Sequence, residues 1–353
     1  MASSAVSPGI FVGVDSGGTR TNVAIKIVHP DGRVVEGSYE VGESLSGALP
    51  TELIPSALRK IVAPLERNIN GNELPATLAY LWISAAGFTP WTRDEYLVAM
   101  HDLLPTLIGG RIQYGGAAND GVSLLLGSRA HGIIIAGTGS TVFVRSADGT
   151  IYQAGGNEWV ASDEGSGFWI SMRGIREAYR DYEAGVDSVL LQRFRQTYGV
   201  RSEDQRGLIE KVRELAVGHK DMKKEIARFA ESVCAAAERG DKGAQNIVKA
   251  AAEGLADVTA ETLRRHFTYN EISEQGLRIV QCGGLLSNNF YRLNFEGQLE
   301  MRLMSSGSRT ASLDWQRVMT GKVAAVRLAT DLASGHDELL NIDRAFRPAI
   351  AGR

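Results

Sequence analysis

The sequence predicts an α/β protein made of two related lobes. Its 353 residues exceed the roughly 100–150 residues of a common single domain, which favours two domains. One supersecondary unit, in which a glycine-rich turn joins two strands, occurs in each half of the chain. Glycine accounts for 40 of the 353 residues, against an average of about 7%, so turns of this kind are a main feature of the chain.

The composition excludes several classes of protein. An apolar fraction of 44% and a charged fraction of 22% are typical of a globular chain rather than a disordered one. The net charge of -3 gives no basic excess for nucleic acid or an anionic membrane. Two cysteines cannot build a disulfide framework or a four-thiolate zinc site within one chain. With no signal-peptide pattern and no 18-residue apolar run, we expect a cytoplasmic protein.

The first glycine-rich turn lies near the N-terminus. Apolar residues 10–12 predict a short buried strand, and Gly-Val-Asp-Ser-Gly-Gly-Thr follows at 13–19. Residues 22–28 predict the next strand, a Pro-Asp-Gly turn follows at 29–33, and a third strand is expected at 34–41.

The second copy of this unit has the same order. Residues 133–136 predict a strand, Gly-Thr-Gly-Ser at 137–140 a turn, and 141–144 another strand. An Ala-Asp-Gly turn at 146–149 and a strand at 150–152 complete it.

Such turns suit phosphate groups. Glycine has no Cβ, so the backbone can approach an anion and direct several N–H groups at its oxygens. Two ordinary tight hairpins are the alternative, but two matching turns, with Asp15 in the first, disfavour it. Neither turn has the Gly-Lys-Ser/Thr of a P-loop, and a strand rather than a helix follows each, unlike the Rossmann fingerprint. Hydroxyl donors are expected from Thr19, Thr21, Thr138 and Ser140.

Helices and strands alternate between the two turns. Residues 48–69 and 91–104 predict helices, and 78–84 predict a buried strand that ends in small residues. A short strand is expected at 111–114. The sequence Gly-Gly-Ala-Ala-Asn-Asp-Gly follows at 115–121 and leads into a helix; its aspartate could be an N-cap or a functional carboxylate.

The second half of the chain is mostly helical from about residue 165 to 266. A strand is expected at 277–282, and Gly283 and Gly284 stand at the corner before the next helix. A glycine pair at such a corner can accept a flat ring, because no side chain covers the backbone. A helix start capped by a polar residue such as Asn288 is a compatible interpretation.

Together these motifs resemble those of the actin-like ATPase and sugar kinase superfamily. Within it, Ser-Asp-Glu-Gly-Ser-Gly-Phe-Trp-Ile at 162–170 is similar to Gly-Asp-Glu-Gly-Ser-Gly/Ala-Tyr-Trp-Ile of the N-acetylglucosamine kinase and BadF-BadG-BcrA-BcrD-type ATPase family. The resemblance covers about residues 11 to 335. It implies two actin-like (ribonuclease H-like) lobes, each a mixed five-stranded sheet with flanking helices, and an ATP cleft between them.

The resemblance also implies how the chain divides. A small lobe is expected at 1–118, and a large lobe at 119–335 with helical additions at about 165–266. A C-terminal helix at about 336–353 is expected to return to the first lobe. Relatives are commonly homodimers, so we expect a homodimer.

The family's catalytic aspartate falls on Asp120, which would take the proton of the acceptor hydroxyl. Asp15 and Asp120 are expected to hold hydrated Mg²⁺. The expected ATP contacts are Asp15, Gly17, Gly18, Thr19, Thr21, Gly137, Thr138, Gly139, Ser140, Gly283, Gly284 and Asn288. The expected sugar contacts are Ser84, Asn119, Asp120, Gly139, Glu158, Asp163 and Glu164.

Two departures from the family pattern bear on the sugar. Asn157 and Glu158 replace a common Trp-Gly pair, and Leu45 stands near the place of a sugar-contacting asparagine. A carboxylate beside a hexosamine pocket would attract the ammonium group of glucosamine and gain nothing from an acetamide. The hypothesis is therefore an ATP:glucosamine 6-phosphotransferase, similar to bacterial glucosamine kinases. Glu158 as a solvated loop carboxylate is the alternative.

Other functions stay open at this point. The nearest is an N-acetylglucosamine kinase or a broad hexosamine or glucose kinase. An ATPase activator of a hydroxyacyl-CoA dehydratase needs two thiolates per protomer for a shared cluster. Cys234 in a helix and Cys282 in the adenosine strand make this unfavourable. A sugar-sensing repressor is disfavoured because no helix-turn-helix fits before Ile10.

Overall fold

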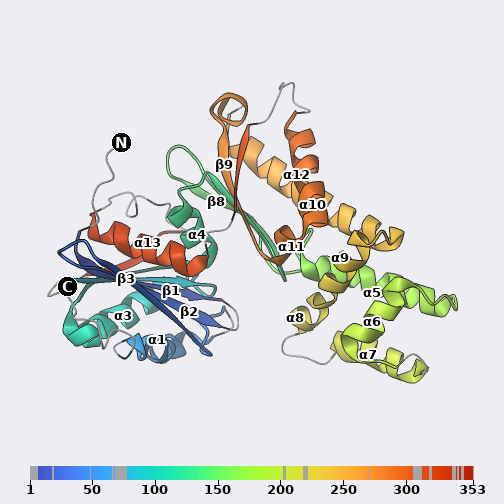
Figure 1. Ribbon diagram of the computed structural model, residues 1–353, viewed down its shortest axis with the longest axis horizontal. Helices are drawn as coiled ribbons and strands as arrows, with labels where there is room; N and C mark the ends of the chain where they lie inside the picture. The colour runs from blue at the N-terminus through green and yellow to red at the C-terminus, as the bar shows by residue number, and fades with distance from the viewer. Residues whose placement is uncertain are drawn as a thin grey trace. The chain divides into compact units, whose positions relative to one another are not determined.

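The computed structural model describes most of the chain. It divides into two compact units, each with its own sheet and its own hydrophobic core (Figure 1). The first unit contains Met1–Ala130, Arg145–Ile151 and Met319–Arg353, and the second contains His131–Val144 and Tyr152–Val318. The described residues are 7–17, 20–47, 49–65, 67, 78–201, 204–217, 222–268, 270–304, 312–317, 320–335, 339, 342 and 346–352.

The sheet of the first unit has six strands in the order β11-β5-β4-β1-β2-β3. β1, β4 and β5 run parallel, whereas β2, β3 and β11 pair antiparallel with their neighbours. β2 alternates buried and half-buried residues, while β4 is buried throughout because helices cover both faces there. The bounds are β1 (Gly9–Ser16), β2 (Thr21–Val28), β3 (Val34–Val41), β4 (Ala79–Ala85), β5 (Ile112–Asn119) and β11 (Ala349–Gly352).

Helices α1 and α3 cover one face of this sheet, and α4 and α13 cover the other (Figure 1). α13 packs directly on β1 at Gly13. A Cβ atom there would lie only 2.3 Å from the backbone nitrogen of Val326, so the close approach requires glycine. The helices and 3₁₀ turns are η1 (Thr51–Leu53), α1 (Ile54–Val62), α3 (Arg93–Leu103), η2 (Leu104–Thr106), η3 (Ile108–Gly110), α4 (Asp120–Ser128) and α13 (Gly321–Ala333).

The sheet of the second unit has five strands in the order β10-β9-β6-β7-β8. β6 pairs parallel with β9 and antiparallel with β7, and β9 pairs parallel with β10. The bounds are β6 (Gly132–Ala136), β7 (Ser140–Arg145), β8 (Ile151–Gly155), β9 (Leu277–Cys282) and β10 (Leu313–Arg317).

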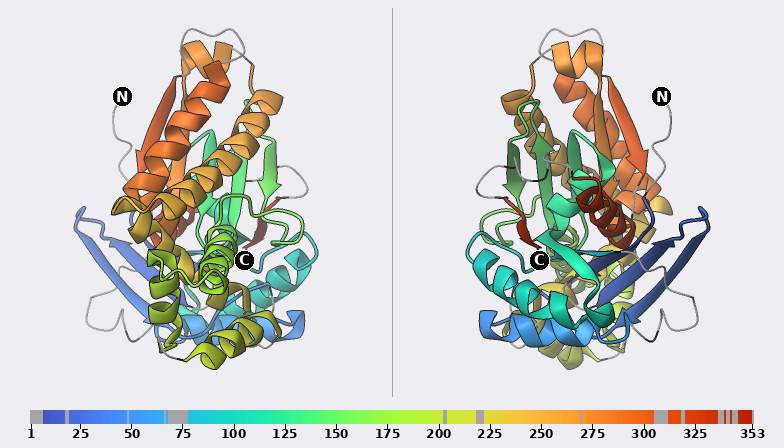
Figure 2. Two further views of the ribbon diagram at one scale, coloured as in Figure 1. Left: turned by 90° about the vertical axis from the view of Figure 1, so that its right-hand side faces the viewer. Right: turned by 90° about the vertical axis from the view of Figure 1, so that its left-hand side faces the viewer.

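Helices make up most of the second unit, and α10 and α12 pack side by side (Figure 2). Local caps start several of them: the Ser166 hydroxyl caps α5, Ser188 caps α6 and Asp241 caps α10. The helices are α5 (Gly167–Glu183), α6 (Val189–Tyr198), α7 (Gln205–Val217), α8 (Met222–Ala227), α9 (Phe229–Glu238), α10 (Lys242–His266), a π-helical turn η4 (Glu271–Gln275), α11 (Gly284–Ser287) and α12 (Asn289–Met304).

The expected fold class is confirmed, since two mixed sheets with flanking helices are present. The first sheet has six strands rather than five because the end of the chain joins it. Residues 349–352, expected in a helix, form β11 antiparallel to β5. Ala349 and Ala351 are buried while Ile350 is half-buried, which is the two-residue period of a strand. The chain end thus belongs to the first unit as a strand.

The boundary between the units also differs from the expected one at 118 and 119. α4 and α13 pack within the first unit, because Gly127 of α4 lets Ala324 of α13 approach closely; a Cβ at Gly127 would lie 2.8 Å from that of Ala324. The strand expected at 111–114 is longer, because residues 115–119, expected only to lead into the helix, belong to β5. Among the residues that the structure describes, no helix has the length and apolarity needed to span a bilayer.

Candidate active site

Three parallel strands of the first unit end at one edge of its sheet, and acidic and polar residues gather there. The register of β1 and β4 places Asp15 beside Ser84. The register of β4 and β5 places Ser84 beside Ala118, one residue before Asn119. Asp120 then begins α4. Four of the residues expected at the site therefore lie along the carboxyl ends of adjacent parallel strands, where α/β sheets commonly bind ligands.

Asp15 lies against the first turn of α13. A Cβ atom at Gly321 would lie 2.3 Å from Cγ of Asp15, so the helix approaches the carboxylate more closely than any other residue type permits. Burial and the charge of Asp120 raise the pKa of Asp15 to about 6, although the backbone N–H and the ammonium group of Lys322 oppose this rise. The carboxylate is thus held between a positive helix start and a second acid.

Asn119, not Asp120, is the N-cap of α4. Its Oδ1 accepts hydrogen bonds from the backbone N–H groups of Gly121 at 2.9 Å and Val122 at 3.4 Å. Asp120 follows as the first helical residue, and its Oδ1 also accepts from Gly121 at 2.9 Å. Burial raises the pKa of Asp120 despite these bonds. The helix start therefore does not depend on Asp120 as its cap.

Tyr96 is a neighbour of Asp120 that the sequence did not indicate. Burial, and secondly the charge of Asp120, raise the pKa of Tyr96. Its ring lies 5.1 Å from that of Phe88, whose carbonyl accepts a 3.4 Å hydrogen bond from Nδ2 of Asn119. The Phe88 carbonyl thus helps to orient the Asn119 side chain, and Tyr96 packs on the Phe88 ring.

The donors at this edge fit a hydrated magnesium ion. Burial, and secondly the charge of Asp120, raise the pKa of Asp15, and a divalent cation would relieve the repulsion between the two carboxylates. Mg²⁺ commonly takes one or two carboxylates and keeps several waters. Within the described part of the chain no cluster of three or more metal-binding side chains occurs, so an all-protein metal cage is not formed there. The buried Ser84 hydroxyl has no hydrogen-bond partner among these residues and could serve a ligand hydroxyl.

The first glycine-rich turn is only partly described. The backbone N–H of Gly17 donates to the carbonyl of Arg20 at 3.0 Å, which closes a tight turn between β1 and β2. Gly18 and Thr19, both expected to contact phosphate, lie outside the described residues.

The Thr21 hydroxyl, expected to contact phosphate, is buried and has partners within the protein. It donates to the carbonyl of Glu43 at 2.6 Å and lies 2.8 Å from the Ser16 hydroxyl. Ser16 Oγ in turn accepts from the backbone N–H of Leu45 at 2.8 Å. These bonds join the loop after β3 to the first glycine-rich turn. The Thr21 hydroxyl therefore stabilises the fold at this point.

The second glycine-rich turn lies on the start of α5. The backbone N–H of Gly137 donates to Gly139 at 2.9 Å and closes the turn. The carbonyl of Gly137 accepts from the N–H of Gly167 at 2.7 Å, and that of Thr138 accepts from Phe168 at 3.1 Å. Carbonyl groups of this turn therefore accept hydrogen bonds from the unpaired backbone N–H groups at the start of α5.

Asp163 contacts the second glycine-rich turn and stabilises its shape. It is buried, and its Oδ1 accepts the backbone N–H of Ser140 at 2.9 Å while its Oδ2 lies 2.7 Å from Nζ of Lys223. The Ser140 hydroxyl donates to the carbonyl of Glu164 at 2.7 Å. A Cβ atom at Gly139 would lie 2.9 Å from Oδ1 of Asp163, so glycine is needed for this approach. Asp163 thus positions the turn, and Lys223 is a further residue that the sequence did not indicate.

Glu158 already has a cation partner. Its Oε2 lies 2.9 Å from Nζ of Lys223, so one ammonium group bridges Glu158 and Asp163. The Glu158 side chain is 75% exposed, and its backbone adopts the left-handed conformation with φ of 67°. The carboxylate therefore stands at the surface with its charge partly neutralised.

The late glycine pair lies beside the second turn. A Cβ atom at Gly283, where φ is 102°, would lie 2.2 Å from the carbonyl oxygen of Ala136, so the ends of β6 and β9 pack backbone to backbone. Gly284 has open space above it. The Asn288 side chain donates to Oε1 of Glu238 at 2.8 Å. No side chain therefore covers the backbone at Gly284, and a contact with adenosine there stays a prediction.

The two sheets, with acidic and glycine-rich turns at the ends of their parallel strands, define an actin-like fold of two related α/β units. The sequence profile of the BadF/BadG/BcrA/BcrD ATPase family matches residues 12–306. The chain belongs to this family.

Relatives of known sequence or structure agree with this fold. An N-acetylmuramic acid/N-acetylglucosamine kinase of Clostridium acetobutylicum is 26% identical over 292 residues, which are 79% of this chain and 86% of that protein. A candidate N-acetylglucosamine kinase of Chromobacterium violaceum has a TM-score of 0.64 at 21% identity, with 90% of this chain and 98% of that one covered. A similar candidate of Porphyromonas gingivalis has a TM-score of 0.62 at 17% identity, with coverage of 91% and 99%.

Proposed function

We propose that the protein transfers the γ-phosphoryl group of ATP to the 6-hydroxyl of an amino sugar. The observation that carries this proposal is the pair Asp15 and Asp120 at the carboxyl ends of parallel strands, two partly buried acids with raised pKa values. Phosphoryl transfer depends mainly on positioning and on charge stabilisation, and a pair of acids can serve both. Membership of an ATPase family and the likeness to a sugar kinase support it.

In this proposal Asp120 orients the acceptor hydroxyl and takes its proton. Burial raises the pKa of Asp120, which makes its carboxylate a stronger base, and general base catalysis is commonly worth about 10²–10⁴-fold. Asp15 and Asp120 would hold Mg²⁺ through water molecules. When bound, the ion supplies positive charge that neutralises the phosphate oxygens.

The nucleotide contacts are proposed on the glycine-rich turns. The turn at 137–140 offers backbone N–H groups and the exposed Thr138 to phosphate oxygens, and Asp163 fixes its shape. The N–H of Gly17 already donates within its own turn, whereas Gly284 would offer an open surface for the adenine ring.

We place N-acetylglucosamine ahead of D-glucosamine as the acceptor. The sequence favoured glucosamine because Glu158 could attract its ammonium group. Nζ of Lys223 lies 2.9 Å from the Glu158 carboxylate, which weakens the attraction of that carboxylate for an ammonium group. In addition, the Clostridium relative is named for N-acetylated sugars. A broad hexosamine or glucose kinase remains the second candidate. The dehydratase-activator alternative is disfavoured further, because Cys234 is buried and burial raises the pKa of its thiol.

A sugar panel tests the function directly. Purified protein with ATP and Mg²⁺ is expected to release ADP with N-acetylglucosamine or glucosamine as acceptor, and mass spectrometry is expected to find the 6-phosphate. The absence of sugar-dependent ADP release over the whole panel would remove the kinase proposal.

The Glu158→Gln variant tests amine recognition separately. Because Lys223 already neutralises this carboxylate, we expect the KM values for glucosamine and for glucose to change by a similar factor, within about threefold. Steady-state kinetics with both sugars measure this. A selective rise for glucosamine would instead assign Glu158 to its ammonium group, as the sequence first suggested.

The Gly321→Ala variant tests whether Asp15 must stay in contact with α13. The new methyl group would meet the carboxylate at 2.3 Å, so Asp15 or the helix start has to move. We expect kcat/KM for ATP to fall at least about tenfold, since small displacements of catalytic groups are costly. Gly297→Ala in α12, where a Cβ meets open space, is the control. Unchanged kcat/KM in Gly321→Ala would show that this contact is dispensable.

The cytoplasmic location and the homodimer stay predictions from the sequence and from the family resemblance.

A further inference from the structure

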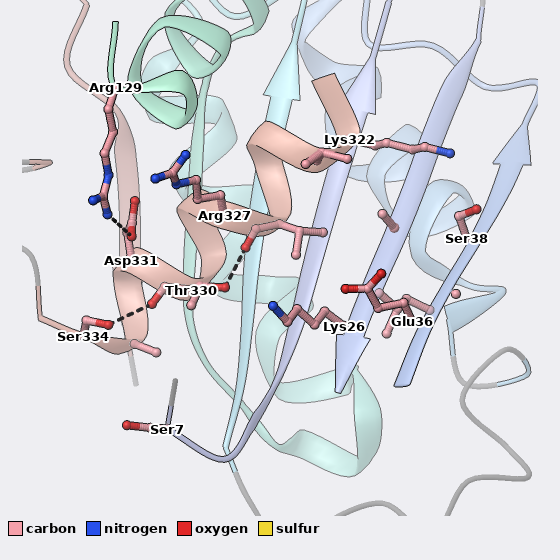
Figure 3. A pocket seen from close by; sticks show the side chains of 16 residues that line it. Ser7, Lys26, Glu36, Ser38, Arg129, Lys322, Arg327, Thr330, Asp331 and Ser334 are labelled. Carbon is pink, nitrogen blue, oxygen red and sulfur yellow. Dashed lines mark hydrogen bonds and ion pairs between the residues drawn. The ribbon is translucent and has the colours of Figure 1, made fainter. Parts of the chain in front are cut away.

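A groove outside the candidate active site lies between α13 and the β2–β3 hairpin of the first unit (Figure 3). Its volume is about 1060 Å³, which is ample for a small organic ligand, since such sites commonly measure about 300–1000 Å³. None of the residues proposed to contact ATP, magnesium or the sugar lines it.

Positive charge dominates the lining of this groove. Lys26, Lys322, Arg327 and Arg129 face only two carboxylates, those of Glu36 and Asp331. The chain as a whole carries a net charge of -3, so the excess of cations here is local. A groove of this sign concentrates anions.

One cation at the centre of the groove is open to a ligand. Lys26 and Glu36 stand directly opposite each other in the β2–β3 register, so both side chains project from the face that α13 covers. Figure 3 shows the Lys26 ammonium group extending toward α13. Within the described residues Lys26 forms no ion pair, although Glu36 is its cross-strand neighbour. Arg129, by contrast, lies 3.4 Å from Asp331.

The polar groups that line the groove indicate a ligand with hydroxyl groups as well as a negative charge. The hydroxyls of Ser38, Thr330 and Ser334 line the groove together with the cations. Thr330 and Ser334 donate to helix carbonyls but keep lone pairs for a donor on a ligand. Ammonium and guanidinium groups bind phosphate oxygens, and hydroxyls suit a polyol. The combination matches a phosphate group joined to a sugar-sized polar body.

We propose that the groove between α13 and the β2–β3 hairpin is a second ligand site, which binds a phosphorylated small polyol such as a sugar phosphate. Lys322 connects it to the candidate active site, because its side chain lines the groove while its backbone N–H bonds to Asp15. An occupant of the groove would therefore act on the charge around Asp15 from outside the catalytic edge.

Equilibrium binding of glucose 6-phosphate and of inorganic phosphate to the whole protein tests this proposal. Isothermal titration is done without ATP and Mg²⁺ and with a saturating acceptor sugar, so that a product site is blocked and no turnover is needed. We expect glucose 6-phosphate to bind with a stoichiometry of one and Lys26→Glu to weaken it at least tenfold. Lys60→Glu, on α1 across the sheet, is the control and should change Kd less than twofold.

The outcomes separate the possible results. Equal binding of inorganic phosphate would assign the site to free phosphate, whereas weaker binding would support the phosphorylated polyol. Absence of binding, displacement by the acceptor sugar, or an equal loss in both lysine variants would overturn the proposal. If Lys26→Glu does not fold, Lys26→Gln replaces it with an expected loss of at least threefold. Because no step requires phosphoryl transfer, a failure here is distinct from a failure of the proposed kinase activity.

Discussion

Asp120→Asn is expected to lower kcat at least about 100-fold while the affinity for ATP stays nearly the same. The amide has the size of the carboxylate and can still accept the N–H of Gly121, so the start of α4 keeps its shape. It cannot, however, take a proton from the acceptor hydroxyl. Steady-state kinetics give kcat, and titration with a non-hydrolysable ATP analogue gives the affinity. Near-normal turnover would remove Asp120 from the role of general base.

The same variant is expected to raise stability at alkaline pH. A carboxyl group whose folded pKa is raised binds its proton more tightly in the folded state, so its favourable contribution is present at low pH and is lost as the pH rises through the folded pKa. Above that pH the wild-type protein holds two partly buried negative charges close to each other, and Asp120→Asn removes one. Thermal unfolding at pH 8 should therefore show a higher Tm for the variant, together with its low activity. A lower Tm would contradict the burial of an uncompensated charge.

The pH profile of the wild-type protein follows from the same pair. Asp15 has a pKa of about 6 in the folded protein, so it becomes protonated as the pH falls through that value. A protonated Asp15 cannot attract a cation, and we therefore expect kcat/KM to fall below about pH 6.

Local patterns were sufficient to predict the framework of the site. A glycine-rich turn between two strands occupies adjacent residues, so both turns, and Asp15 within the first, could be read from short segments. The parallel strands were also readable from apolar runs, and their shared direction places Asp15 and Ser84 side by side. The sequence offered Asp120 as an N-cap or a functional carboxylate, whereas the cap is its neighbour Asn119, a residue type that is an equally good cap.

Contacts between distant segments could not be predicted in this way. Lys223 reaches Glu158 and Asp163 from 60 or more positions along the chain, and no periodicity marks a single lysine in a polar helix as their partner. For that reason Lys223 could not be identified from the sequence as the ion-pair partner of Glu158. Gly321 carries a weak signal, a glycine at a helix start, but its approach to Asp15 depends on how α13 packs.

Asp163→Ala is expected to cause the largest loss of stability at the second glycine-rich turn. Asp163 is 2% exposed, and its carboxylate accepts the N–H of Ser140 and forms an ion pair with the ammonium group of Lys223. Breaking a buried pair commonly costs about 3–5 kcal/mol because one charge is left without a partner. Lys223 keeps Glu158 and is partly exposed, so we expect a loss of about 2–3 kcal/mol in the free energy of unfolding. Chemical denaturation measures it, with the exposed Asp102→Ala as control.

Two further variants separate the charge from the hydrogen bond. Asp163→Asn can still accept the N–H of Ser140 but leaves Lys223 without its buried partner, so it should cost less than Asp163→Ala. Adding Lys223→Met to Asp163→Asn removes the ammonium group that has lost its buried partner, and part of the stability should return. The KM for ATP should rise in Asp163→Ala more than in the double variant if Asp163 acts by shaping the turn at 137–140. If instead the double variant binds ATP worse than Asp163→Ala, Lys223 itself contacts the nucleotide, and the positioning role belongs to the lysine rather than to Asp163.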